Sequence, residues 1–556
     1  MRFLNLVHNP VVKKIIEHAG LSATRRTEHS EYEHFFRCTS GRWIYNEQEQ
    51  MRIRYVSFNV DALKQLATTA ARANQCVEMV KIAEGSFNKI FRLTFDNGEK
   101  LIAKIPCPLS APPRLCTASE VATMDYARNV LGVPVPHVLR WNADADASEV
   151  GTEYILMEHV QGVELYQRKQ NFGKEGRAFV DNIVDIECKF TRRRFSQIGS
   201  LYYKEDVSPA LQERPLYAEG EQDGDGSDRF RIGPYVEWDI WRGKRSDIRA
   251  DRGPWPDALS YIKALIDIEK KWITNFAIPR QPHDTFRCSG NDNLPDTHIR
   301  LLDDFLAVLP SILPGEDLCT PVLWHNDLHA ANIFVAPEGQ PDISGLIDWQ
   351  GISVRPLFLA AGFASCLKYD GDERIVIPPG ITSISPPPGY DSLPEEEKAY
   401  MKKQLRFAAM HKYYEIRVMQ RNPPYFASQT YPNIEHIIPP IYSASRTWYE
   451  GPHHLRQMLL DLHGAWEGIA PGVPYPVSWD ADEIARHREE YPKLMEYEDR
   501  IAQVVKGLQL EGDGWVTNER FDDVKRRNTK IIKNWNPKEL GGPYPFQDGG
   551  PSWFLS

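Results

Sequence analysis

Four polar side chains between positions 325 and 348 are the residues of this chain best suited to chemistry: His325, Asp327, Asn332 and Asp348. An asparagine and an aspartate that converge offer oxygen ligands for Mg²⁺, which usually takes one or two from the protein together with substrate phosphates. A separate carboxylate nearby, such as that of Asp327, can accept a proton from a substrate hydroxyl. These residue types therefore indicate a divalent-cation site beside a general base.

The spacing of Asn332 and Asp348 predicts that the two residues meet. Asn332 opens one apolar run, Asp348 closes the next, and turn-forming residues at 337–341 separate them. Their midpoint, position 340, falls inside this turn. In an antiparallel hairpin, residues at equal distances from the turn lie opposite each other. We therefore expect Asn332 and Asp348 to lie side by side at one end of a hairpin.

The elements that must position these residues fall into a β-rich part followed by a mostly helical part. The segment Asp96-Asn97-Gly98 predicts a tight turn between two strands, and Gly132 with Pro134 ends a helix. The order predicts an α+β fold with two lobes, because strands and helices do not alternate as in a doubly wound sheet. Strands are expected at 80–83, 89–95, 100–105, 153–158, 321–324, 332–336 and 343–348, and helices at 117–131, 176–194, 257–276, 297–309 and 481–509.

The composition excludes several function classes. The 556 residues carry 66 basic and 76 acidic side chains, a formal net charge of −10. Sequence-independent nucleic-acid binding needs a basic surface, so no nucleic-acid partner is expected. No apolar run approaches the roughly 18 residues of a membrane span, so no integral membrane segment is expected. The 8 cysteines form no C-x-x-C pair, which favours a reducing compartment over a disulfide framework or a zinc ribbon.

Residues 1–30 form a basic N-terminal segment. Its first 26 positions contain Arg2, Lys13, Lys14, Arg25 and Arg26 but a single acid. A basic, acid-poor, amphipathic start is typical of a mitochondrial transit peptide, whereas an ordinary first helix with a basic face is the alternative. The expected localisation is therefore mitochondrial or cytoplasmic.

The pattern of His325, Asp327, Asn332 and then Asp348 on the next strand resembles the catalytic residues of protein-kinase-like phosphotransferases. The second histidine, His329, and Ile-Asp-Trp in place of Asp-Phe-Gly are similar to the aminoglycoside phosphotransferase branch. Further blocks resemble a fungal family of this superfamily that includes the altered inheritance of mitochondria protein 9 proteins. These blocks are Cys38–Trp43, Glu84–Lys89, Ser119–Thr123 and Ile347–Gln350, and the resemblance extends roughly from Phe35 to Phe363.

This resemblance implies a protein-kinase-like fold that transfers the γ-phosphate of ATP to a hydroxyl group of a small-molecule acceptor. Asp327 would be the catalytic base, and Asn332 and Asp348 would hold Mg²⁺. A peptide acceptor is less favoured, because the stretch after Asp348 runs directly into 355–360 without A-P-E or a long activation segment. The implied divisions are an N-lobe at 31–160, a C-lobe at 161–535 with a helical insertion at 162–320, and an irregular tail at 536–556.

The resemblance also implies a nucleotide site in the N-lobe. Lys104 would bind the phosphates of ATP and pair with Glu120. The segment from Gly85 to Lys89, which includes Ser86, would lie over the phosphates. The backbone from Glu158 to Val160 would bind the adenine.

Each of these roles has an alternative: Asp327 as an acid that caps a loop, and Lys104 as a lysine at a strand edge. For His325 the resemblance implies a structural role, in which it holds the catalytic loop by hydrogen bonds. Thr117-x-x-Glu120 also matches a capping box, which would give the Glu120 carboxylate to a helix start. Gly85 stands without the other glycines of G-x-G-x-x-G, which favours a second hypothesis: a catalytically weak, kinase-like pseudoenzyme with a nucleotide-binding or mitochondrial maintenance role. Retention of Lys104, Asp327, Asn332 and Asp348 favours an active enzyme.

Two further patterns imitate metal sites. His325 and His329 have the spacing of a zinc pair on a helix, but His325 follows a strand and Asp327 is not the glutamate of that motif. The segment 223–228 resembles the start of a calcium loop. Its sixth position is Asp228 rather than glycine, and Pro234 stands at the twelfth, so a solvated acidic loop is expected instead.

Overall fold

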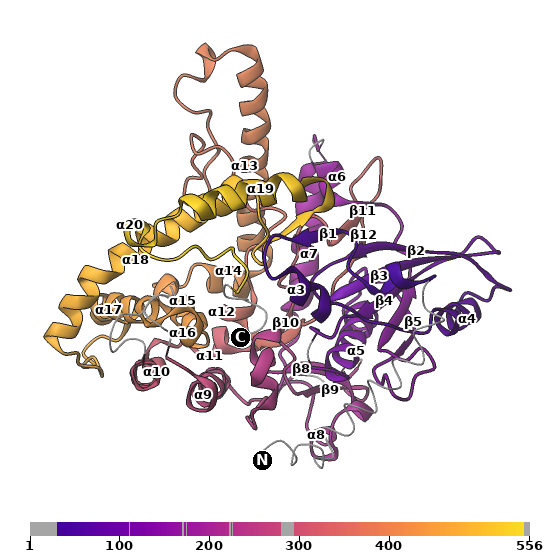
Figure 1. Ribbon diagram of the computed structural model, residues 1–556, viewed down its shortest axis with the longest axis horizontal. Helices are drawn as coiled ribbons and strands as arrows, with labels where there is room; N and C mark the ends of the chain where they lie inside the picture. The colour runs from indigo at the N-terminus through magenta and orange to yellow at the C-terminus, as the bar shows by residue number, and fades with distance from the viewer. Residues whose placement is uncertain are drawn as a thin grey trace, which may run out of the picture.

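The largest sheet contains five antiparallel strands in the order β2-β3-β4-β6-β5 (Figure 1). The structure is a computed structural model that describes residues 31–549 except 111, 170, 171, 174, 222, 223, 225 and 280–293. The strands are β2 (Cys76–Glu84), β3 (Asn88–Phe95), β4 (Lys100–Pro106), β5 (Val138–Asn142) and β6 (Tyr154–Glu158). The four strands predicted in this part of the chain are confirmed, although β2 begins earlier than expected.

The alternation of side chains along β4 decides what each face of this sheet contacts. Ala103 and Ile105 are buried in a cluster with residues of α2 (Glu33–Phe36) and α4 (Val60–Ala70). Because successive side chains of a strand point to opposite faces, Lys104 points the other way, toward α5 (Leu115–Asn129). Most residues of α5 are buried, which fixes this helix behind the sheet.

The second lobe combines helices with three small antiparallel sheets, ordered β10-β13, β12-β11-β7 and β8-β9. Their strands are β7 (Val163–Glu164), β8 (Ser200–Tyr203), β9 (Phe230–Gly233), β10 (Pro321–Trp324), β11 (Ile333–Val335), β12 (Ile343–Leu346) and β13 (Ser353–Pro356). The hairpin β8–β9 lies inside the insertion predicted at 162–320 and was not expected from the sequence. The helices around the sheets are α6 (Leu165–Lys169), α7 (Gly176–Phe190), α8 (Pro209–Gln212), α9 (Ala258–Phe276), α10 (Pro295–Ile312), α11 (Glu316–Cys319) and α12 (Leu357–Ala360).

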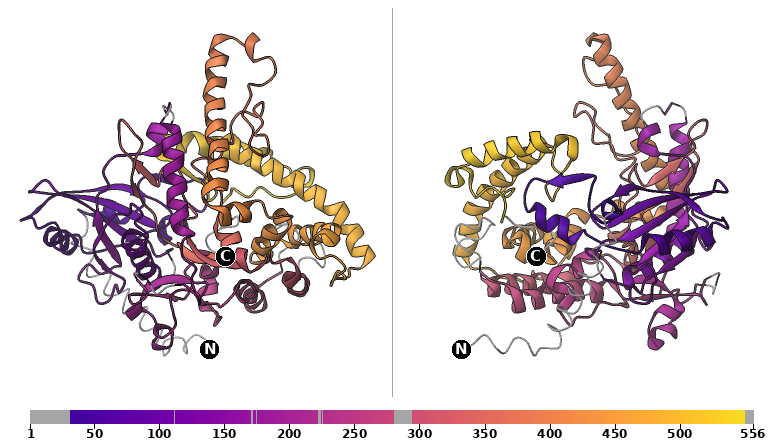
Figure 2. Two further views of the ribbon diagram at one scale, coloured as in Figure 1. Left: turned by 180° about the vertical axis from the view of Figure 1, so that it is seen from behind. Right: turned by 45° about the vertical axis from the view of Figure 1, so that its right-hand side comes forward.

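The C-terminal part is almost entirely helical and returns to the N-terminal lobe. The predicted helix at 481–509 is confirmed as α18 (Ala481–Leu508). The first half of α13 (Glu395–Arg421) stands out from the body, and α18 with α19 (Asn518–Asn534) leads back to α3 (Glu47–Ile53) and β1 (Gly41–Trp43), as both views of Figure 2 show. The remaining elements are α14 (Pro423–Gln429), α15 (Ile434–Ala444), α16 (Thr447–Glu450), α17 (Pro452–Ile469), β14 (Trp515–Thr517) and α20 (Pro537–Leu540).

A β-rich lobe followed by a mostly helical one confirms the predicted α+β, two-lobed, protein-kinase-like class. Beyond Trp535 the described tail has one helical turn, α20, and Tyr544 and Phe546 are buried against Ile44 and Tyr45. Within the described residues, no helix combines the length and the apolar character needed to cross a bilayer. The predicted transit peptide at 1–30 lies outside the described residues.

Candidate active site

The loop after β10 is organised around a buried histidine. The backbone N–H of Asp327 donates to Nδ1 of His325 at 3.3 Å, and Nε2 of His325 lies 3.2 Å from the carbonyl oxygen of Ile347. Burial lowers the pKa of His325, which favours the neutral ring. Because Nδ1 accepts, Nε2 carries the proton and donates to Ile347. The imidazole therefore connects the backbone at Asp327 with the segment that leads into Asp348.

Asn332 joins the same loop from the start of the hairpin. Its Nδ2 donates to the backbone oxygen of Asp327 at 3.1 Å and to Oδ2 of Asp327 at 3.2 Å. Asn332 is buried, whereas the side chain of Asp327 is 55% exposed. The Asp327 carboxylate is thus held by a buried amide while one side stays open to a ligand. The amide oxygen of Asn332 is the atom that could bind a cation.

The predicted hairpin is present, but its register differs from the expected one. Ile333 pairs with Leu346, and the N–H of Ile347 donates to the oxygen of Asn332 at 3.0 Å, so Ile347 rather than Asp348 lies opposite Asn332. The expectation that Asn332 and Asp348 lie directly opposite is wrong by one residue. The physical reason is the position of the turn, which is centred on 339 rather than 340 because Val335 pairs with Ile343. The register shift between Phe334 and Val335 then brings Ile347, rather than Leu346, opposite Asn332.

Asp348 follows β12 with a left-handed backbone, φ = 62°. Few residues other than glycine adopt this conformation, and strained backbone of this kind is concentrated at functional sites. The side chain of Asp348 is 46% exposed, and its Oδ1 lies 3.5 Å from Nζ of Lys104. The turn therefore brings the carboxylate of the second lobe to the lysine of the first.

Lys104 forms a buried ion pair with Glu120. Its Nζ lies 2.6 Å from Oε1 of Glu120, and the two side chains are 6% and 5% exposed. Burial opposes the charged lysine, but the carboxylates of Glu120 and Asp348 outweigh it and raise the pKa of Lys104. The capping-box alternative for Glu120 is wrong: α5 begins at Leu115, and Thr117 inside it donates to Glu153 at 2.5 Å.

The segment from Gly85 to Asn88 connects β2 and β3. The N–H of Gly85 donates to the oxygen of Asn88 at 3.0 Å, and the space where a Gly85 side chain would begin is empty to 4 Å. Nδ2 of Asn88 donates to Oε1 of Gln350 at 2.5 Å, just beyond Asp348. We call residues 85–88 the phosphate loop. It lies close to the same segment as Lys104 does, although its contact with phosphate stays a prediction.

Glu158 and Val160 lie where the chain passes between the lobes. Oε2 of Glu158 accepts from the N–H of His137 at 2.9 Å. Val160 packs on β12 so closely that a Cβ on Gly345 would lie 2.5 Å from its Cγ1. Only glycine at 345 allows this approach. The connection is therefore fixed to the hairpin, and adenine binding by its backbone remains a prediction.

The structure bears on one of the two sequence patterns that resemble metal sites, the histidine pair. Both ring nitrogens of His325 face backbone groups, and Nδ1 of His329 accepts from the N–H of Ala331. The two histidines therefore do not turn toward a common zinc ion. Within the described residues, no group of three or more His, Cys, Asp or Glu side chains is arranged to hold a metal. Positions 223 and 225 of the calcium-like segment lie outside the described residues.

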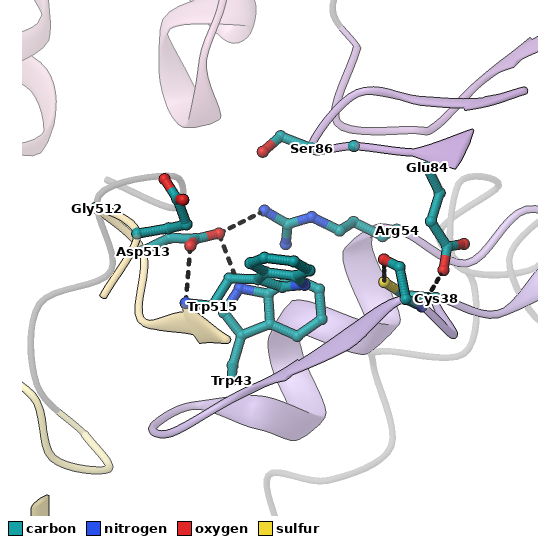
Figure 3. Close-up of a pocket in the computed structure, with 11 residues that line it drawn as sticks. Cys38, Trp43, Arg54, Glu84, Ser86, Gly512, Asp513 and Trp515 are labelled. Atoms are coloured by element: carbon teal, nitrogen blue, oxygen red, sulfur yellow. Dashed lines mark hydrogen bonds and ion pairs between the residues drawn. The ribbon is translucent and has the colours of Figure 1, made fainter. Parts of the chain in front are cut away.

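A cavity of about 580 Å³ lies beside the phosphate loop (Figure 3). Gly85 and Ser86 form part of its wall, and residues 511–513 with Trp515 form another part. No sequence pattern predicts that the C-terminal part reaches this region. Arg54 and Asp513, which form an ion pair here, are far apart along the chain and belong to no motif.

Three comparisons place the chain among known proteins. A model of the family described as "Phosphotransferase enzyme family" (APH) matches residues 78–359, which include every predicted site residue. A subtelomeric hrmA-associated cluster protein of Aspergillus fumigatus is 29% identical over 489 residues, covering 82% of this chain and 92% of that protein. The altered inheritance of mitochondria protein 9, mitochondrial, of Yarrowia lipolytica is 24% identical and covers 88% of this chain and 86% of its own.

Solved structures give a weaker likeness. A ternary complex of aminoglycoside phosphotransferase APH(4)-Ia with ADP and hygromycin B is 14% identical, with a TM-score of 0.33. The match covers 74% of this chain and 99% of the APH(4)-Ia chain. A complex of streptomycin, ATP and APH(2")-IIa gives the same TM-score, 0.33, also at 14% identity.

Proposed function

The chain belongs to the phosphotransferase enzyme family, whose model matches just over half of it, and on this premise we propose that it transfers the γ-phosphate of ATP to a hydroxyl group of a small molecule. The observation that carries the proposal is the position of Lys104, whose ammonium contacts Glu120 at 2.6 Å and Asp348 at 3.5 Å. One buried cation thus links the N-lobe helix to the second lobe at the predicted metal ligand.

Asp327 is proposed as the general base. Its carboxylate would accept the proton of the acceptor hydroxyl while the hydroxyl oxygen bonds to the γ-phosphorus and ADP leaves. Asn332 and the ring of His325 hold the Asp327 loop by the hydrogen bonds described above. Such positioning matters because phosphoryl transfer requires little covalent help from the protein.

Asn332 and Asp348 are proposed to hold Mg²⁺ through the amide oxygen and the carboxylate. A pair of oxygen donors beside bound phosphates fits the preference of this ion. When bound, Mg²⁺ neutralises charge on the phosphate oxygens. Lys104 would add a second positive charge, and burial keeps it in place before any nucleotide arrives.

A small molecule is the favoured acceptor class. β13 begins at Ser353, soon after Asp348, and pairs with β10, and α12 follows directly. Protein kinases use a long segment at this point to dock a peptide. The short connection here offers no comparable platform within the described residues.

The proposal is tested by ATP turnover of the purified full chain against a panel of hydroxyl-bearing metabolites. We expect Asp327→Asn to lower turnover by about 10²-fold or more, as loss of a general base does. Asp342→Asn is the matched control, because Asp342 is an exposed aspartate in the turn of the same hairpin. Binding of Mg·ATP without turnover by the unmodified chain, whatever the acceptor, would instead support the pseudoenzyme alternative, which the single glycine of the phosphate loop favours.

We also propose a mitochondrial site of action. The relative from Yarrowia lipolytica carries the word mitochondrial in its name, and the first 26 residues of this chain are basic and acid-poor. A tagged full chain that fractionates only with the cytosol would contradict this localisation.

A further inference from the structure

The C-terminal part of the chain is hydrogen-bonded to the N-terminal lobe as a strand. β14 pairs antiparallel with β1, with Gly41 opposite Thr517 and Trp43 opposite Trp515. Nδ2 of Asn518 donates to the oxygen of Thr39 at 2.7 Å. A Cβ on Gly41 would lie 2.4 Å from the ring of Trp515, so the contact is close along the whole pair. We call residues 511–517 the C-terminal strap.

A buried carboxylate fixes the strap in place. Asp513 accepts from Nε1 of Trp43 at 2.8 Å and from Nη2 of Arg54 at 3.0 Å, as Figure 3 shows. The N–H of Trp515 donates to its other oxygen at 3.1 Å. The side chains of Arg54 and Asp513 are 1% and 7% exposed. A buried pair of this kind is costly to break from one side, because the remaining charge stays without its partner.

The residues that the strap holds are the same ones that hold the ends of the phosphate loop. Lys89, directly after the loop, donates from Nζ to the backbone oxygen of Arg54 at 2.9 Å and is buried. Glu84, directly before the loop, accepts from the backbone N–H groups of Thr39 and Ser40, the latter at 2.5 Å. Both ends of the loop are therefore anchored to residues 39–54, which pair with the strap.

The tip of the phosphate loop is not covered by the strap. The cavity of about 580 Å³ separates Gly85 and Ser86 from Gly512 and Asp513 (Figure 3). The loop thus has fixed ends and a tip at which Gly85 and Ser86 border open space. The N–H of Gly85 already donates to the oxygen of Asn88, so the Ser86 hydroxyl is the group of this tip that we propose for a phosphate contact.

We infer that Asp513 is a positioning residue for nucleotide phosphates: through Arg54 it fixes the Lys89 end of the phosphate loop. Through Trp43 it also fixes β1, which directly follows the residues that hold the Glu84 end. The inference rests on the proposed function, since it concerns the ATP site of the same enzyme. It assigns a role in that site to a residue of the C-terminal part, which the family match at 78–359 does not reach.

The test compares the binding of Mg·ATP and of adenosine to the full chain and to Asp513→Asn by calorimetry. The amide keeps the size of the carboxylate but removes its charge, so the loop ends are expected to loosen. We expect the Kd for Mg·ATP to rise by about tenfold, because small displacements of positioning groups have large effects. The Kd for adenosine, which lacks phosphates, should change less than about twofold, within the scatter of changes away from the contact. Asp523→Asn is the matched control, because Asp523 is half-exposed and forms ion pairs with Arg526 and Arg527 of its own helix.

The outcomes separate the inference from the proposed function. Unchanged Mg·ATP binding in Asp513→Asn overturns the inference, and so does an equal loss of both ligands, which would indicate a general disturbance. If the unmodified chain binds neither ligand, the proposed function itself fails. If Asp513→Asn does not fold, Trp43→Phe removes one donor to Asp513 and keeps an aromatic, though smaller, side chain at this position. It should weaken Mg·ATP binding by about threefold and leave adenosine binding unchanged. Unchanged Mg·ATP binding in this variant overturns the inference.

Discussion

Replacing Lys104 with methionine should have two separable effects, one on stability and one on chemistry. The substitution leaves the carboxylate of Glu120 buried without its cation, in a site where both side chains are almost inaccessible to water. Exposed ion pairs contribute only about 0–1 kcal/mol. Loss of one member of a buried pair costs about 3–5 kcal/mol, because the remaining charge is not solvated. The burial of this pair places Lys104→Met in the second class.

The double variant Lys104→Met/Glu120→Leu separates the effect on catalysis from the effect on stability. An apolar pair of similar volume often replaces a buried ion pair at little cost, so most of the lost free energy of unfolding should return. Turnover of ATP should not return, because the lysine ammonium proposed to contact the phosphates is then absent, and it should stay lower by about 10²-fold or more. Lys100→Met, at the exposed start of the same strand, is the control and should change stability by less than about 0.5 kcal/mol.

Urea denaturation gives the free energy of unfolding of each variant, and a coupled assay gives ATP turnover. If the double variant recovers both stability and turnover, Lys104 has only a structural role and the proposed phosphate contact is wrong. If Lys104→Met loses less than about 1 kcal/mol, the pair behaves as an exposed one. The reasoning from burial would then be refuted.

Two further predictions concern Glu187 and Asp348. Burial raises the pKa of Glu187 to about 8, despite a hydrogen bond from Tyr414. The contribution of Glu187 to the free energy of unfolding is therefore fully present below about pH 4.5 and is lost as the pH rises through about 8. Glu187→Gln should remove this pH dependence, which amounts to a change on the order of 3–5 kcal/mol in the free energy of unfolding. Urea denaturation at several pH values checks it, and an unaltered slope would assign the pH dependence to other groups. Asp348→Ala should abolish the Mg²⁺-dependent part of the thermal stabilisation by ATP, measured with and without a chelator, and undiminished stabilisation would remove Asp348 from the metal site.

The elements around the site could be predicted from the sequence because their signals are local. β3 and β4 alternate apolar residues around the Asp96-Asn97-Gly98 turn, and Gly98 adopts the positive φ that such a turn requires. α5 lies two residues from its expected position at each end. The ion pair of Lys104 with Glu120, implied by the family resemblance, is present at 2.6 Å. The catalytic and ligand-binding roles stay predictions.

The register of the hairpin could not be predicted with the same certainty. Counting from the turn placed its centre at position 340, whereas the pairing of Val335 with Ile343 places it at 339. The register shift between Phe334 and Val335 then restores one of the two residues of difference. No residue type in this stretch signals the exact centre of the turn or the bulge. Side chains of a β-strand alternate between its two faces, so a shift of the register by one residue changes which side chains lie opposite each other. Asp348 reaches Lys104 nonetheless, since its left-handed backbone turns the chain after β12.

The pairing of β1 with β14 could not be predicted from the sequence for a different reason. Its two strands are three residues long and separated by most of the chain, so no periodicity or turn signal connects them. The interaction of Trp43, Arg54 and Asp513 can be recognised only in the folded structure, where the three side chains are in contact. Long-range pairings of this kind are decided by the packing of the whole chain, and here they join the last helices to the start of the N-lobe.

The same pairing bears on the choice between an active enzyme and a pseudoenzyme. A phosphate loop with one glycine lacks the flexibility of G-x-G-x-x-G, and on sequence alone this favours weak nucleotide binding. A loop whose ends are fixed by Glu84 and Lys89 needs less flexibility, because less conformational entropy is lost when it binds. Holding the ends through Asp513 therefore offsets the missing glycines. The proposal therefore predicts that substitutions in the strap lower the affinity for Mg·ATP more than substitutions that change the composition of the loop.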